Sequence, residues 1–204
     1  MGKLGWDRHV WEIPADMKSD STKVYLVVKA LFVLTSSSIR MSLLAFYLWL
    51  IKGAGRSTLT TIIYVCMGAN AVLCIACCVA DFLRCSPVSA AWTSPMPAGA
   101  KCINDGVTTM VAGSFLCLAD LIVNALPILI VAKLKIPGRQ RITIGILLCI
   151  GSLATLAGIV REVWIYKTLL ATNDWTWEAL PLWICAEAEI YIALVSSSAH
   201  VRQP

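Results

Sequence analysis

Hydrophobic and polar positions alternate along the chain in long blocks. Five apolar stretches are each long enough for a helix to cross a hydrocarbon core, which takes about 20 residues. They cover residues 24–51, 59–83, 106–132, 142–166 and 178–199, and short polar breaks with turn-forming residues separate them. None shows the strict alternation of an outer-membrane β-strand. The pattern predicts an all-α, polytopic bundle of transmembrane helices that occupies residues 24–199.

Composition places this bundle in a membrane. Of the 204 residues, 58% are hydrophobic and 14% are charged, whereas soluble domains have roughly 45–50% and about 25%. This balance excludes a soluble globular protein, and it also excludes an intrinsically disordered chain, which would be rich in charge. The basic residues are scattered between apolar blocks instead of gathered in a patch, so we expect membrane lipid around the chain and no nucleic-acid partner.

The basic residues of the connecting loops predict an orientation. The first and third loops carry Lys52, Arg56, Lys133, Lys135, Arg139 and Arg141, and the second and fourth carry Arg84, Lys101 and Lys167. Cytoplasmic loops are enriched in Lys and Arg, so we expect the first and third loops to face the cytoplasm. Residues 1–23 then form an extracellular or lumenal segment, and residues 200–204 form a short cytoplasmic tail, in the plasma membrane or an endomembrane.

The nine cysteines divide into two groups. Seven lie within apolar stretches, where we expect them to act as small packing residues: Cys66, Cys74, Cys77, Cys78, Cys117, Cys149 and Cys185. The spacing of Cys74, Cys77 and Cys78 resembles a metal or redox motif, but no second ligand pair completes it, so we expect no metal. Cys85 and Cys102 lie in the second loop, on the expected oxidising side, where a disulfide persists. We predict that they are bridged, which stabilises the protein by about 3 kcal/mol.

Ionisable side chains within the spans are the candidates for function, because charge deep in a bilayer is costly. The candidate ligand site or intramembrane polar network consists of Arg40, Asp120, Asn124, Arg161 and Glu189. Asp120 and Asn124 are four residues apart and therefore share a helix face with Pro127. Two interpretations stay open: interhelical ties that fix packing, and a polar ligand pocket or proton path. Judged by depth, a single site is not expected to contain all four charged residues.

A set of motifs, in order along the chain, carries a family resemblance. They are Gly5-x-x-Arg8-His9-x-Trp11, Arg40-Met41-Ser42-Leu43-Leu44-x-Phe46-Tyr47-Leu48, Cys85-Ser86-Pro87-Val88 with Trp92 and Cys102-Ile103-Asn104, Leu134-x-Ile136-Pro137-x-Arg139-Gln140, and Gly158-Ile159-Val160-Arg161. Together they resemble the fungal rhodopsin-domain integral membrane proteins, a family that includes Pth-type receptor-like proteins and membrane proteins of satratoxin-type and other secondary-metabolite clusters.

The resemblance implies a seven-helix architecture. The five stretches correspond to its last five helices, so we expect either a shortened chain or a reduced member without the first two. It also implies a receptor-like sensor of a small hydrophobic external ligand, with a cytoplasmic signalling partner at the loop 133–141.

A function from a different class stays open: a membrane-embedded enzyme, carrier or accessory protein of a secondary-metabolite pathway. Asp120 or Glu189 would then act as the acid or proton carrier. Several features speak against catalysis and bound cofactors. The last span has no lysine for a retinal Schiff base, and His9 and His200 are expected on opposite sides of the membrane. The chain also has no glycine motif that cradles phosphate.

Overall fold

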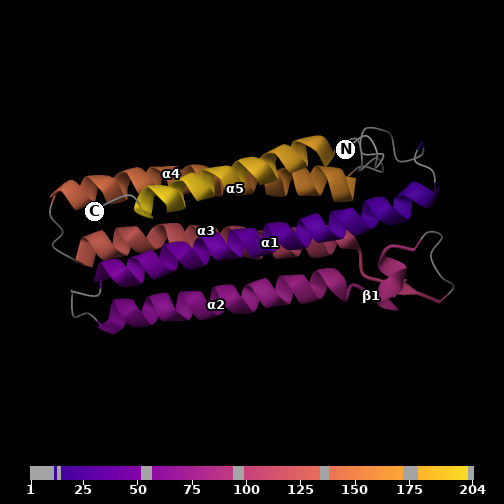
Figure 1. The fold of residues 1–204 in the computed structure, drawn as a ribbon, viewed down its shortest axis with the longest axis horizontal. Helices are drawn as coiled ribbons and strands as arrows, with labels where there is room; N and C mark the ends of the chain where they lie inside the picture. The colour runs from indigo at the N-terminus through magenta and orange to yellow at the C-terminus, as the bar shows by residue number, and fades with distance from the viewer. Residues whose placement is uncertain are drawn as a thin grey trace.

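Five long helices lie lengthwise beside one another in an elongated bundle (Figure 1). The computed structural model describes residues 12, 15–51, 57–93, 99–133, 138–171 and 179–201. The helices are α1 (Ala15–Ile51), α2 (Ser57–Phe82), α3 (Asp105–Lys133), α4 (Gly138–Ile165) and α5 (Ala179–Val201). This arrangement confirms the predicted all-α bundle, and the loop between α2 and α3 marks one end of it, which we call the disulfide end.

In the described part of the chain, four helical stretches are long enough and apolar enough to cross a membrane. They are Ser19–Ile51, Thr58–Phe82, Asp105–Val131 and Leu148–Ala171. Large apolar side chains stand on the outer surface of these helices; Val72, for example, is 68% exposed and Val65 is 65% exposed. An apolar exterior of this kind is stable in lipid and unfavourable in water. The chain is therefore a multi-pass membrane protein, and a fifth crossing, by α5, stays a prediction.

Two helices extend beyond the stretches that hydropathy delimits. α1 begins at Ala15, inside the segment expected to precede the first span, and its first turns carry an ion pair of 2.9 Å between Lys23 and Asp20. α4 is followed by a π-helix, η4 (Tyr166–Ala171), in which Thr168 is fully buried. The predicted spans of residues 24–51 and 142–166 stop short of both extensions, because each extension contains polar and charged residues.

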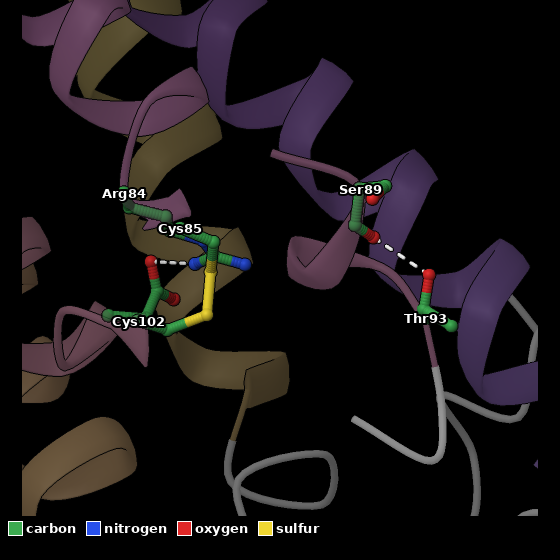
Figure 2. Close-up of a disulfide and its surroundings, with 6 residues drawn as sticks. Arg84, Cys85, Ser89, Thr93 and Cys102 are labelled. Carbon is green, nitrogen blue, oxygen red and sulfur yellow. Dashed lines mark hydrogen bonds and ion pairs between the residues drawn. A yellow bond between two sulfur atoms is a disulfide. The ribbon is translucent and has the colours of Figure 1, made fainter. Parts of the chain in front are cut away.

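The disulfide end is closed by a small hairpin. Strands β1 (Cys85–Ser86) and β2 (Lys101–Cys102) pair antiparallel with Cys85 opposite Cys102, and the short helix η3 (Val88–Ala91) lies between them. The two cysteines form a disulfide of 2.00 Å (Figure 2), which confirms the predicted bridge. α3 follows directly, because the Asn104 side chain accepts a hydrogen bond of 2.9 Å from the Gly106 N–H and caps the helix.

Most of the buried apolar residues in the described part of the chain fall into two clusters. The larger one lies toward the end opposite the disulfide and contains Leu43, Leu44, Tyr47, Leu59, Ile63, Val123, Leu126 and Ile130 among others. The smaller one consists of Val33, Cys77 and Leu116, with Cys74 and Cys78 packed against it. The three cysteines with metal-like spacing thus contribute to packing. Arg40 on α1, Asn70 on α2 and Asp120 on α3 lie near the boundary between the two clusters in sequence, so they form a polar layer there.

Candidate functional site

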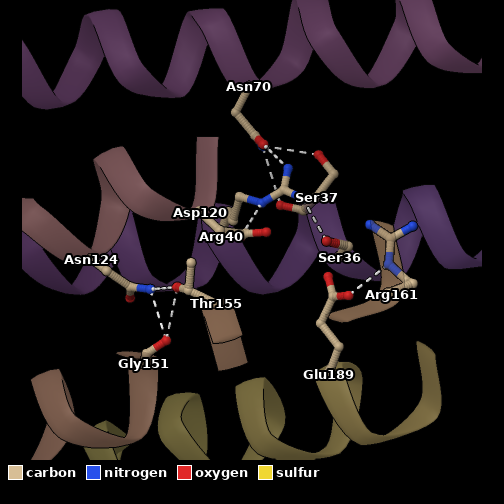
Figure 3. A network of polar contacts seen from close by, with 10 residues as sticks. All are labelled: Ser36, Ser37, Arg40, Asn70, Asp120, Asn124, Gly151, Thr155, Arg161 and Glu189. Atoms are coloured by element: carbon tan, nitrogen blue, oxygen red, sulfur yellow. Dashed lines mark hydrogen bonds and ion pairs between the residues drawn. The ribbon is translucent and has the colours of Figure 1, made fainter. Parts of the chain in front are cut away.

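Arg40 on α1 is the centre of the polar layer. Its Nε donates to Asp120 Oδ1 at 2.7 Å, its Nη1 to Asn70 Oδ1 at 2.9 Å and its Nη2 to Ser36 Oγ at 2.6 Å (Figure 3). The Asn70 amide in turn donates to Ser37 Oγ at 2.9 Å. Arg40 is only 2% exposed. A buried guanidinium is therefore satisfied by side chains from α1, α2 and α3, which ties these three helices together.

Sequence reasoning missed Asn70. Its signal was available, because it is an amide in the middle of the very apolar helix α2, where a buried polar group needs a partner. In a hydropathy analysis, one asparagine within an apolar helix does not stand out as a candidate site residue.

A second contact joins α3 to α4. Asn124 Nδ2 donates to Thr155 Oγ1 at 2.6 Å and to the Gly151 carbonyl at 2.9 Å. The helices approach so closely here that a Cβ at Gly151 would collide with the Asn124 amide. Asp120 and Asn124 lie on the shared face that their spacing predicts, while α3 continues through the buried Pro127.

The third contact joins α4 to α5. Arg161 Nε donates to Glu189 Oε2 at 2.8 Å, and both residues are 6% exposed. Arg161 Nη2 also lies 3.4 Å from Glu162 Oε1. The guanidinium lies 4.7 Å from the centre of the Phe32 ring on α1, a favourable cation–π position. Arg161 therefore links α1, α4 and α5.

These contacts surround a small central cavity. Its volume is about 30 Å³, and its polar lining comes from Ser36, Arg40, Asp120, Asn124 and Glu189. A volume of this size holds on the order of two water molecules where polar groups are present. Four of the five predicted site residues thus line one cavity. Arg161 does not line it and lies on the other side of Glu189, in keeping with the expectation that one site does not hold all four charged residues.

A larger cavity lies next to Arg161, between α1 and α5. Its volume is about 250 Å³, and we call it the α1–α5 cavity. Its apolar wall includes Leu31, Phe32, Ile165, Leu182 and Ala186, and its polar wall includes Tyr25, Lys29, Thr109, Arg161, Trp183 and Glu187. Concave sites with apolar walls and a few polar groups are where small molecules bind.

A polar network at the disulfide end was also missed from the sequence. Lys29 Nζ lies 2.7 Å from Asp81 Oδ1 and 3.2 Å from Asp105 Oδ1. Asp105 also pairs with Arg84 and accepts a hydrogen bond of 3.2 Å from the Tyr25 hydroxyl. Arg84 and Asp105 flank the two bridged cysteines, so pairing the cysteines already brings these two residues together. That adjacency was the signal in the sequence.

Comparison with known proteins adds one result. A family model described as the fungal rhodopsin domain matches residues 1–204. No match was found among curated proteins or among solved structures.

Proposed function

The chain belongs to the fungal rhodopsin-domain family, and we propose that it is a receptor-like membrane protein that senses an apolar small molecule. The ligand would enter the α1–α5 cavity. The disulfide end would face the exterior, and the loop 133–141 would meet a cytoplasmic signalling partner.

One observation carries this proposal: the α1–α5 cavity shares a wall with the polar layer. Arg161 lines the cavity, its Nε binds Glu189, and Glu189 lines the central cavity together with Asp120. A molecule in the α1–α5 cavity would therefore touch the Arg161–Glu189 ion pair. Together with the Arg40–Asp120 pair and their neighbouring contacts, this pair connects the five helices. A ligand shifts a conformational equilibrium only if it contacts the two states differently, and we propose that the pairing of Arg161 with Glu189 is what differs.

A response assay tests the proposal. Bioorthogonal fluorophores at Ala45 on α1 and Val195 on α5, both exposed, would report movement at the end opposite the disulfide while a library of apolar compounds is screened. We expect at least one compound to change energy transfer saturably in the wild type. Leu182→Trp, which fills the α1–α5 cavity, should abolish the change, and Leu156→Trp, a 56% exposed position on α4, should preserve it. Equal responses in both variants, or no responding compound, would count against the proposal.

Orientation is tested separately. An epitope inserted within residues 94–98 should be accessible to antibody on intact cells or sealed vesicles of outside-out orientation. The same epitope within residues 52–56 should become accessible only after permeabilisation. The reverse pattern would overturn the proposed topology.

A carrier for an apolar metabolite, as in a secondary-metabolite pathway, is the second candidate. The observation that favours it is that Asp120 Oδ2 and Glu189 Oε1 have no hydrogen-bond partner among the described residues. Two carboxylates at one small polar cavity could pass a proton. Proton-coupled flux of a responding compound into proteoliposomes would support the carrier, and binding without flux would support the receptor.

A further inference from the structure

We infer that the α1–α5 cavity takes an uncharged, oxygen-bearing apolar molecule whose acceptor oxygen binds the guanidinium of Arg161. The inference rests on the proposed function for its place in sensing, but it concerns binding alone. It follows from which donors of the cavity wall are already engaged.

Lys29 has no donor left for a ligand. An ammonium group has three N–H donors. Lys29 Nζ directs them at Asp81 Oδ1 at 2.7 Å, Asp105 Oδ1 at 3.2 Å and Thr109 Oγ1 at 2.7 Å. Lys29 therefore presents its hydrocarbon stem to the cavity, while its charge belongs to the network at the disulfide end.

Arg161, in contrast, has N–H donors that no described residue engages. A guanidinium has five N–H donors, and among the described residues Arg161 makes one hydrogen bond, from Nε to Glu189. Its Nη2 is buried without a hydrogen bond, although Glu162 Oε1 lies 3.4 Å away. Figure 3 shows both terminal nitrogens turned away from Glu189. Nη1 likewise makes no hydrogen bond among the described residues and, unlike Nη2, is not buried, so an acceptor atom in the cavity would bind Nη1.

The charges around Arg161 exclude an ionised ligand. Glu162 and Glu189 already compensate the guanidinium, so a ligand carboxylate would add a third negative charge to one cation. A ligand ammonium would meet the side chains of Arg161 and Lys29 in the same wall. Either ion would have to leave water for an apolar cavity without a partner of its own. A ketone, ester or alcohol avoids both penalties.

The rest of the wall fits such a molecule. Phe32, Ile165 and Leu182 supply apolar contact, and Glu187 is exposed, with no ion pair or hydrogen bond among the described residues, so it can accept from a hydroxyl. The volume of about 250 Å³ lies just below the range of roughly 300–1,000 Å³ for drug-sized ligands. A single chain or ring system is therefore the expected size.

Photolabelling of the full chain in lipid nanodiscs tests the inference. The probe is 1-decanol that carries a diazirine, with labelled positions mapped by mass spectrometry. Competitors are decan-2-one, decanoate and decylammonium at equal concentrations in the lipid. We expect saturable labelling of α1 and α5 at the cavity and competition by decan-2-one. The two ions should compete roughly ten-fold more weakly, because each would bury an unpaired charge.

Three variants sharpen the test. Leu182→Trp should abolish saturable labelling, whereas Leu156→Trp should leave it unchanged. Arg161→Lys keeps a positive charge but replaces the two terminal nitrogens by one ammonium group, which we expect to pair with Glu189 and Glu162. It should raise the probe concentration for half-maximal labelling roughly five-fold, the loss of about one hydrogen bond.

Three outcomes would overturn the inference: equal or stronger competition by decanoate, unsaturable labelling spread over the lipid-facing surface, or saturable labelling retained in Leu182→Trp. If the probe binds saturably but no compound changes energy transfer, the inference stands and the proposed sensing function fails. The two results are therefore distinguishable.

Discussion

Arg40 on α1 donates a hydrogen bond of 2.7 Å to Asp120 on α3, across 80 residues of sequence. The pair lies between two apolar clusters, and Arg40 is 2% exposed. Breaking a buried ion pair by removing one partner leaves the other charge uncompensated, which is far more costly than losing an exposed pair.

Arg40→Met should therefore destabilise the protein by about 3–5 kcal/mol. Asp20→Asn, which removes the exposed pair between Asp20 and Lys23 on the same helix, should cost about 0–1 kcal/mol. Reversible chemical unfolding in detergent measures both. Similar losses in the two variants would show that Arg40 contributes no more than a surface charge.

The close approach of α3 and α4 predicts a contrast between two glycines. Gly151→Ala would push a Cβ into the Asn124 amide and should destabilise by about 1–3 kcal/mol through overpacking. Gly68→Ala on α2 meets nothing within 4 Å and should be neutral or stabilising by up to about 1 kcal/mol, because alanine favours a helix. Thermal unfolding of both variants, side by side, checks the prediction, and a tolerated Gly151→Ala would contradict the interhelical contact.

The disulfide should contribute measurably to stability. Replacing both Cys85 and Cys102 by alanine should cost about 3 kcal/mol, because the bridge restricts the unfolded chain. Cys149→Ala, at an exposed and unbridged cysteine, should have little effect. Unfolding with and without reductant provides the measurement: reductant should destabilise the wild type and Cys149→Ala but leave the double variant unchanged.

We expect Asp105 to influence the charge preference of the α1–α5 cavity through its contact with Lys29. Asp105→Asn removes one of the two carboxylates that bind Lys29 and leaves part of that charge uncompensated beside the cavity. Competition by decanoate in the photolabelling assay should then strengthen roughly ten-fold, near the lower end of the range for a charge-assisted hydrogen bond. Asp20→Asn is the matched control. No gain for decanoate in Asp105→Asn would indicate that Lys29 does not set the charge preference.

The sequence predicts the helices and the disulfide because both depend on local or loop-level patterns. Long apolar blocks form helices in lipid wherever they occur, and Cys85 and Cys102 share one loop. The shared face of Asp120 and Asn124 follows from helical spacing alone.

The pairing of charges did not follow from the sequence. Several cations and acids lie within the helices, and which of them meet depends on the relative register of packed helices. Arg161 binds Glu189 and approaches its neighbour Glu162, a choice that no local pattern encodes. Asn70 and Asp105 each have a signal in the sequence, but the residues of other helices that they bind appear only in the packed bundle.

The most direct test of the central claim is the ligand response of Asp120→Asn. Asparagine removes the charge that compensates Arg40 but preserves an acceptor for its Nε–H, so the variant should be less stable yet still fold, reach the membrane and retain photolabelling of the α1–α5 cavity. We expect that a compound active on the wild type no longer changes energy transfer between positions 45 and 195, because the polar layer no longer transmits the contact at Arg161. A folded, correctly localised Asp120→Asn variant with an unchanged response would contradict it.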